Sequence, residues 1–401
     1  MVKSNLPKVT NFEMIGGNEM DVFRDSEAEL NRFLGQNLEQ YSRLRNFDFG
    51  PDKRDNVSQL SKYISHRVVD EYDLVRATLG VSTYERAEKF IQEVFWRVYW
   101  KGWLEHRPTV WNDFVAFDQQ DKMLSQNNDK NYLAAINGET GIACFDSWVQ
   151  ELCHTNYLHN HARMWFASIW IFTLGLPWQS GAQFFLKHLL DGDAASNTLG
   201  WRWVAGIQTK GKCYLARSEN IHKFTGGRFG NDRLNEQALP LLDEKVHPVQ
   251  PVDYFARSEQ KFETLLVMDS NLNMLDKPEA KNYKKIYILR IANAHRQIAI
   301  SQQVAEFKQN LIKSAAQKHP HCEVLNAGEA TEVLGKIPGC DVCYPFIGEN
   351  LDFLHRSNGL WNIDLNFIKQ HEDLYCWQFA TKGFFNFKKN IPAIIKTLFQ
   401  S

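Results

Sequence analysis

The most informative stretch of this sequence runs from residue 157 to residue 203. It contains YLHNHARM (157–164), WQSG (178–181) and DGDAASNTLGWRW (191–203). Asn160 and Arg163 are three residues apart, so they share one face of a predicted helix. A charged arginine in so apolar a helix needs a buried partner, which Asp191 or Asp193 can supply. Taken alone, these residues favour a structural salt bridge.

The composition of the 401-residue chain is that of an ordinary globular protein. Hydrophobic residues make up 44% and charged residues 23%, which excludes a mainly disordered or collagen-like chain. The net charge of −1 gives no global attraction to nucleic acid, so DNA binding would need a local patch. Residues 1–17 lack the apolar core of a signal peptide, and the longest uncharged apolar run, Met164–Trp178, is short of a membrane span. We therefore expect a cytoplasmic protein that does not enter a membrane.

The seven cysteines are scattered along the chain, and free thiols are the expectation for a protein without a secretion signal. Cys340 and Cys343 have the spacing of a metal or redox pair. A zinc or iron–sulfur site needs further ligands, and no second pair exists. We predict no metal site, and buried thiols are the other interpretation of this pair.

The hydrophobic periodicity divides the chain into two regimes. Helical patterns cover 28–44, 61–78, 84–103, 145–153, 159–174 and 180–190. After a proline-containing linker (235–260), short apolar runs at 264–268, 285–289, 322–325, 341–346 and 361–365 read as strands, separated by helices at 298–318 and 329–334. The sequence therefore predicts an N-terminal arm (1–20), a helical domain (21–260) and a doubly wound, Rossmann-like α/β domain (261–401).

The order and spacing of the first motifs resemble the FAD-binding domain of the DNA photolyase/cryptochrome family. The family pattern runs T-G, G-W-x-H-N-x-x-R-M, D-W-x-x-G and D-x-D-x-A-x-N-x-x-x-W-x-W, from which Tyr157 and Pro177 depart. Upstream, VSQLSKYI (57–64) resembles the family's phosphate-binding T-S-x-L-S-P-Y-L, and EVFWR (93–97) resembles its E-x-x-W-R. This resemblance covers roughly residues 21–260 and implies a mostly helical FAD-binding domain.

The resemblance implies a set of FAD-binding residues. They are Tyr41, Val57, Ser58, Gln59, Leu60, Ser61, Arg97, Asn160, Arg163, Asp191, Asp193 and Asn197. Segment 57–61 would hold the phosphates at a helix start. Arg163 and Asp191 would flank the isoalloxazine ring, and Asn197 would face its N5 atom.

The resemblance also implies the residues of catalysis and substrate binding. Glu93, Asn197, Trp201 and Trp178 would be catalytic, the two tryptophans as the first members of an electron-transfer chain. Glu93, Trp96, Asn160, Met164 and Trp203 would form the substrate pocket, with Trp96 and Trp203 stacking on a flipped dinucleotide. An ungapped count places Ser125 at the third position of the chain. The outer electron donor is therefore missing or supplied elsewhere, for example by Tyr132 or Trp148.

Three functions follow from the resemblance. The first is a photolyase, in which reduced, light-excited FAD splits cyclobutane pyrimidine dimers in damaged DNA. The second is a cryptochrome-like photoreceptor without repair activity, and the third is a flavoprotein module that binds partners. A basic window fits a phosphate track or merely a solvated face; its residues are Arg202, Lys210, Lys212, Arg217, Lys223, Arg228 and Arg233. We expect a monomer, and the identity of any antenna chromophore is left open.

The order of the two regimes differs from that of the family, in which an α/β domain precedes the flavin domain. Here only about twenty residues precede the helical region. Residues 265–278 faintly resemble the opening strand and loop of the family's α/β domain. We expect a circular permutation, with an unrelated nucleotide-type domain as the alternative.

Overall fold

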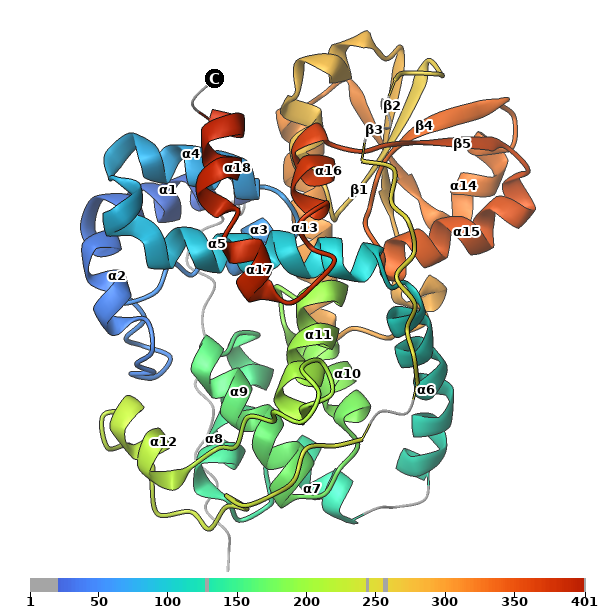
Figure 1. The fold of residues 1–401 in the computed structure, drawn as a ribbon. Coiled ribbons are helices and arrows are strands. Elements are labelled where there is room, and N and C mark those ends of the chain that lie inside the picture. Colours follow the sequence, from blue (N-terminus) through green and yellow to red (C-terminus); the bar gives the residue numbers. More distant parts are fainter. Residues whose placement is uncertain (1–20, 127–129, 243–244, 255–258, 400–401) are drawn as a thin grey trace, which may run out of the picture.

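A computed structural model describes residues 21–126, 130–242, 245–254 and 259–399. A mainly helical part carries a smaller α/β part with a parallel sheet at one corner (Figure 1). This confirms the predicted fold class, a helical region followed by a doubly wound parallel sheet.

The helical part contains most of the N-terminal half of the chain. Its elements are α1 (Val22–Arg32), the π-helix η1 (Phe33–Asn37), α2 (Leu38–Leu44), α3 (Ser61–Ile64), α4 (Glu71–Val81), α5 (Tyr84–Glu105), α6 (Thr109–Gln126), α7 (Lys130–Asn137), α8 (Ala143–Thr155), α9 (Asn160–Ser168), the π-helix η2 (Ile169–Thr173), α10 (Trp178–His188), α11 (Ala194–Ala205) and α12 (Ser218–Phe224). The long helix α5 begins where the Thr83 side chain accepts a hydrogen bond from Arg86 N. It crosses the molecule and contacts α2, α4 and α11, so it is the element around which the site is built.

The α/β part is an all-parallel five-stranded sheet with the order β3-β2-β1-β4-β5. Its elements are β1 (Thr264–Met268), η3 (Leu272–Asp276), η4 (Pro278–Asn282), β2 (Lys285–Arg290), η5 (Asn293–His295), α13 (Gln302–Lys318), β3 (Cys322–Asn326), α14 (Ala327–Leu334), β4 (Gly339–Cys343), α15 (Glu349–Trp361) and β5 (Asp364–Ile368). The central strands β1 and β4 are almost entirely buried, as expected for a parallel sheet covered on both faces. The chain order reverses between β1 and β4, which makes their carboxyl ends the switch point of the sheet.

Three expected elements differ from the sequence prediction. The helix expected over 61–78 is broken, because Arg67 has a φ of 47° and Asp70 begins α4 by accepting from Tyr72 N at 2.7 Å. The strand expected over 361–365 starts at Asp364, since Trp361 is the last residue of α15 and Asn362 ends that helix in the left-handed conformation. The strand expected over 341–346 is β4, which begins and ends earlier.

The C-terminal helices return to the helical part. They are α16 (His371–Trp377), α17 (Phe384–Lys388) and α18 (Ile391–Phe399). Helices α16 and α17 pack along α5, and α18 lies beside α4 (Figure 1). The ring of Trp377 lies so close to α5 that a Cβ atom added at Gly102 would be 2.4 Å from it, so Gly102 is the residue that permits this approach.

The paired cysteines of the sheet lie in the core. Cys340 and Cys343 are free thiols of β4 with exposed fractions of 0% and 2%, and burial raises the pKa of each to about 12. Within the described ranges, no group of three His, Cys, Asp or Glu side chains is arranged to hold a metal ion. In the same ranges, no helix combines the length and the apolar character that crossing a bilayer requires.

Candidate flavin and substrate site

A cavity of about 470 Å³ opens among α2, α5, α9 and α11. Its volume lies in the usual range for sites that hold small molecules and cofactors. Of the residues predicted from the resemblance, those that line it are Tyr41, Val57, Ser58, Gln59, Ser61, Glu93, Trp96, Arg97, Asn160, Arg163, Met164, Asp191, Asn197, Trp201 and Trp203. Residues separated by up to 162 positions in the sequence thus meet around one space.

Asp191 stands between two arginines at the inner wall of the cavity. Arg163 Nη2 donates to Asp191 Oδ2 at 2.9 Å, and its Nε donates to the carbonyl oxygen of Leu158 at 2.9 Å. Arg97 Nη2 lies 3.7 Å from the same carboxylate oxygen. Burial alone would raise the pKa of Asp191, but Arg163 and Arg97 hold it below its ordinary value. The salt bridge expected from the sequence exists, and the cavity places it where a ligand would touch it.

The polar groups of this wall fit the isoalloxazine and phosphates of FAD. Asn197 Nδ2 donates to the carbonyl oxygen of Ala182 at 2.8 Å, which fixes the amide and leaves its oxygen for the cavity. Ser61 Oγ and Asp191 Oδ1 are buried and make no hydrogen bond of full geometry within the described part of the chain, although the Ser61 hydroxyl is near enough to Asp191 to help lower its pKa. Buried polar atoms without partners are rare and usually mark the place of a missing ligand or water. These residues therefore fit a ligand that is rich in acceptors and donors.

Glu93 faces the cavity from α5 and is paired with Arg45 of the loop after α2. Arg45 Nη1 donates to Glu93 Oε1 at 2.6 Å. Burial raises the pKa of Glu93, and the charge of Arg45 opposes this rise without cancelling it. The Glu93 carboxylate is therefore partly desolvated and paired with Arg45 at the rim of the cavity.

Two tryptophans bound the outer end of the cavity, and each is held by a second aromatic ring. Trp96 stacks on Phe384 of α17 with ring centroids 3.5 Å apart and planes 13° from parallel. Trp203 stacks on Tyr214 with centroids 5.7 Å apart. Because one face of each indole is occupied, its orientation is fixed before any ligand binds.

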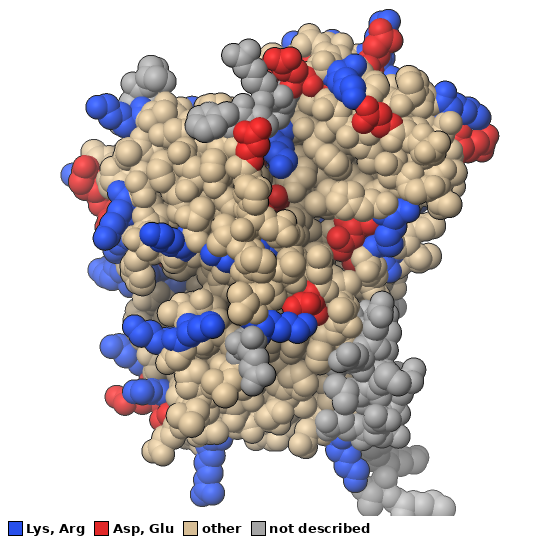
Figure 2. All heavy atoms as spheres, turned by 45° about the vertical axis from the view of Figure 1, so that its right-hand side comes forward, with Lys and Arg blue, Asp and Glu red and all other residues tan. Residues whose placement is uncertain are grey.

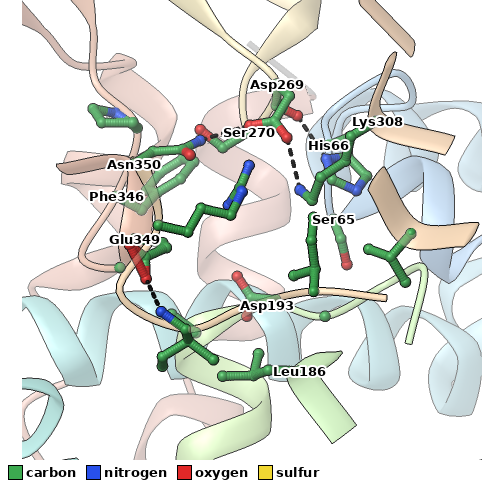
Figure 3. A pocket seen from close by; sticks show the side chains of 18 of the residues that line it. Ser65, His66, Leu186, Asp193, Asp269, Ser270, Lys308, Phe346, Glu349 and Asn350 are labelled. Carbon is green, nitrogen blue, oxygen red and sulfur yellow. Dashed lines mark hydrogen bonds and ion pairs between the residues drawn. The ribbon is translucent and has the colours of Figure 1, made fainter. Parts of the chain in front are cut away.

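Three predicted site residues lie away from this cavity. Leu60 is fully buried in the hydrophobic core. Asp193 caps α11 by accepting from Ser196 N at 2.8 Å, and it lines the smaller cavity of Figure 3 instead. Trp178 is 7% exposed and stacks on Phe114. The roles proposed for these residues stay predictions.

Some residues of the cavity were not predicted from the sequence. Arg45 lines it, and the signal for it was its place four residues after Tyr41, on the same helical face. Tyr157 also lines it and lies under two guanidinium groups, 4.9 Å from Arg54 and 5.4 Å from Arg163. Phe384 does not line the cavity but stacks on Trp96, which does; it follows the sheet in the sequence, and no local pattern could have indicated this contact.

A smaller cavity of about 90 Å³ lies where the carboxyl ends of β1 and β4 face the helical part (Figure 3). Part of its polar wall is internally paired, whereas Ser270 Oγ and Arg296 Nε have no hydrogen-bond partner within the described chain. Asp269 accepts from Lys308 Nζ and from Asn350 Nδ2, each at 2.7 Å, and Lys308 helps hold the pKa of Asp269 below its ordinary value against the effect of burial. The switch point of an open parallel sheet is a usual place for ligands, but the predicted flavin residues gather elsewhere.

The basic window after α11 divides into buried and exposed members. Arg202 is buried, with its guanidinium 5.8 Å from the centre of the Trp178 ring. Arg228 pairs with Asp48 at 2.9 Å. The remaining members are exposed; they are Lys210, Lys212, Arg217, Lys223 and Arg233. Figure 2 shows basic side chains spread across the helical half of the visible face, while acidic and basic groups are mixed around the α/β part.

Comparison with known proteins gives one family match. Residues 90–227 match the family described as the FAD binding domain of DNA photolyase. The chain is 27% identical over 199 residues to the deoxyribodipyrimidine photo-lyase of Vibrio cholerae, covering 48% of this chain and 41% of that protein. It is 34% identical over 159 residues to the photo-lyase of Streptomyces griseus, covering 39% of this chain and 33% of that protein.

Among solved structures, a bacterial class III photolyase from Agrobacterium tumefaciens aligns with 51% of this chain and 42% of its own, at 25% identity and a TM-score of 0.42. The chain thus spans well under half of the length of these relatives.

Proposed function

The helical part of this chain belongs to the photolyase/cryptochrome family and is an FAD-binding domain; on that premise we propose that the protein is a light-driven lyase that splits cyclobutane pyrimidine dimers in DNA. One observation carries the proposal. A single cavity joins the polar wall around Asp191 to a rim formed by Glu93, Trp96 and Trp203. Cofactor and substrate would therefore meet in the same space.

The chemistry of the reaction would come from FAD, which when reduced and excited by light is a strong one-electron donor. The chain supplies position and electrostatics. Arg163 and Asp191 would hold one edge of the ring; their salt bridge is already formed, so little rearrangement would accompany binding. The fixed amide of Asn197 offers its oxygen to an N–H group of the cofactor.

At the rim, the chain would bind a dimer that has been turned out of the DNA stack. The free faces of Trp96 and Trp203 provide apolar surfaces for its bases, and their other faces are occupied by Phe384 and Tyr214. A protonated Glu93 carboxyl, the form that burial favours and the charge of Arg45 opposes, can donate a hydrogen bond to a pyrimidine carbonyl oxygen. Such a bond strengthens when negative charge develops on that oxygen after electron transfer.

The DNA backbone would lie over the exposed basic residues near this rim. The exposed lysines 210 and 212 follow α11, which also carries Trp203. On a protein with a net charge of −1, such a local patch supplies the phosphate contacts that the whole molecule does not.

We also propose that the α/β part corresponds to the family's first domain, moved to the end of the chain. Two contacts support this. The guanidinium of Arg76 in α4 lies 5.4 Å from the centre of the Phe399 ring at the end of α18, and Val22 N in α1 donates to Ser314 Oγ in α13 at 3.4 Å. The helix that follows the sheet therefore ends beside the first helices of the flavin part, where the family's usual connection would run.

The experiment that tests the proposed function is a repair assay with the whole protein. The protein with reduced FAD is illuminated with near-ultraviolet or blue light in the presence of dimer-containing single-stranded and double-stranded DNA. Restoration of the pyrimidines supports the lyase. Intact dimers beside a bound and photoreducible flavin support the photoreceptor without repair activity.

A further inference from the structure

A row of aromatic rings in contact extends from Trp201 away from the cavity. Trp201 contacts Trp170 of η2 edge to face, with ring centroids 6.2 Å apart. Trp170 in turn contacts Tyr132 of α7 edge to face, with centroids 6.0 Å apart. Trp201 lines the cavity, whereas Tyr132 is partly exposed. The three rings thus form a continuous path from the cavity to the surface.

Gly181 is the residue that lets the first two rings meet. A Cβ atom added at this position would lie 2.3 Å from the Trp201 ring and 3.0 Å from the Trp170 ring. Any side chain here would force the indoles to shift. The contact between Trp201 and Trp170 is therefore built into the backbone of α10.

Trp178, which the family resemblance indicates as the second electron donor, has a different environment. It stacks on Phe114, and the guanidinium of Arg202 lies 5.8 Å from its ring centre. A cation beside an electron-rich ring stabilises the neutral ring and repels the radical cation that remains after electron loss. Arg202 therefore makes Trp178 a poorer electron donor.

Proton transfer also favours the path from Trp201 through Trp170 to Tyr132. Trp201 Nε1 is buried without a hydrogen-bond partner within the described chain, and Trp170 Nε1 donates to the carbonyl oxygen of Pro177 at 2.9 Å. Neither nitrogen faces a base, so an oxidised indole at either position keeps its proton. It can then be reduced again by an electron from the next ring. Tyr132 is partly exposed, and an oxidised tyrosine there can release its phenolic proton to water. Trp148 is fully buried against Trp165 and lacks such access.

We propose that Tyr132, through Trp170 and Trp201, is the principal route by which electrons reach the flavin in this protein. This inference rests on the proposed function of the cavity as a flavin site. Trp201 gives one electron to the light-excited oxidised flavin, Trp170 refills Trp201, and Tyr132 refills Trp170 while losing its proton to water. A thiol in solution then gives a hydrogen atom to the tyrosyl radical, which restores Tyr132, leaves the thiol as a thiyl radical and leaves the transferred electron on the flavin.

The test is photoreduction of the flavin-loaded protein by blue light and a thiol, in four variants. Trp170→Phe should slow the initial rate at least about tenfold, because phenylalanine is harder to oxidise than tryptophan by far more than the ~1.4 kcal/mol that one decade requires. Tyr132→Phe should abolish the tyrosyl radical seen by electron paramagnetic resonance after a flash. Trp178→Phe and the control Trp148→Phe should keep most of the rate, and retained flavin absorbance checks folding in each variant.

The outcomes separate this inference from the function on which it rests. If Trp178→Phe loses the rate while Trp170→Phe keeps it, the route through Trp170 is overturned and the flavin site stands. The route is also overturned, and the flavin site again stands, if the flash-induced tyrosyl radical persists in Tyr132→Phe. If no variant and no parent protein retains flavin, the proposed function itself fails.

Discussion

Trp96 of α5 stacks face to face on Phe384 of α17, with centroids 3.5 Å apart, although the two residues come from opposite ends of the chain. The same C-terminal segment binds α5 through its backbone. Tyr99 Oη donates to the carbonyl oxygen of Lys382 at 2.9 Å, and Arg107 Nη2 donates to that of Thr381 at 2.9 Å. The segment after the sheet therefore helps position Trp96, a residue of the proposed substrate pocket.

Phe384→Ala should lower the free energy of unfolding by about 3–5 kcal/mol, the usual cost of removing a buried phenylalanine. It should also weaken binding of dimer-containing DNA, because Trp96 loses the ring that fixes it. Phe385→Ala is the matched control for stability, because the side chain of Phe385, the neighbour of Phe384, is 79% exposed. Urea unfolding followed by tryptophan fluorescence measures the stability of both variants. Equal stability of the two variants would show that the segment does not pack on α5.

Asp191→Asn should lower FAD affinity by about 1–3 kcal/mol, because it leaves Arg163 without its charged partner at the cavity wall. Asp193→Asn is the control. Asparagine caps a helix as well as aspartate does, and Asp193 faces the other cavity. Flavin released on dilution, followed by its fluorescence, compares the two. Equal release from both variants would contradict the placement of the ring edge at Asp191.

The buried carboxyl group of Glu105, at the junction of α5 with the sheet, should make the free energy of unfolding depend on pH. It accepts from Tyr344 Oη at 2.7 Å and from Ile347 N at 3.2 Å, and burial raises its pKa from 4.5 to about 7. The folded state then holds a proton that the unfolded state has lost, so stability falls as pH rises from about 4.5 to about 7. Glu105→Gln should remove this fall, which has a limiting slope of about 1.4 kcal/mol per pH unit. Urea unfolding at several pH values measures it, and parallel curves for the two proteins would refute it.

Trp203→Ala should weaken binding to a dimer-containing strand by about 1–3 kcal/mol, which is the usual contribution of one stacked base. Trp203→Phe should keep most of the affinity. Replacing Lys210 and Lys212 with glutamine should instead weaken binding to damaged and undamaged strands alike and reduce its salt dependence. Fluorescence anisotropy at several salt concentrations separates the two effects. A salt dependence unchanged by the lysine replacements would remove this patch from the DNA interface.

The sequence predicted those parts of the molecule that local patterns determine. The apolar runs that became β1, β2 and β3 are continuous and bounded by polar residues, and α5 shows helical periodicity along its whole length. The motif residues of α9 and α11 converge on the cavity because the helices that carry them pack together.

The remaining features depend on contacts between distant segments. The stacking of Phe384 on Trp96 requires the chain to return to α5 after the sheet, which no periodicity in residues 371–399 indicates. The meeting of Trp170 with Trp201 depends on the π-helix η2 and on the absence of a side chain at Gly181. The motif position of Asp193 indicates a flavin contact, whereas in the structure its carboxylate accepts a hydrogen bond from Ser196 N and caps α11.

Repair of a defined substrate tests the central claim most directly. Single-stranded and double-stranded DNA with one cyclobutane dimer is mixed with the protein carrying reduced FAD, illuminated, and analysed for restored pyrimidines, beside Glu93→Ala. We expect light-dependent repair by the parent protein and, in Glu93→Ala, a loss of repair yield larger than any loss of FAD binding, because the proposed contact of the Glu93 carboxyl is with the substrate and not with the ring edge. Dimers that stay intact in both kinds of DNA, although the bound flavin is fully reduced and illuminated, would contradict the lyase.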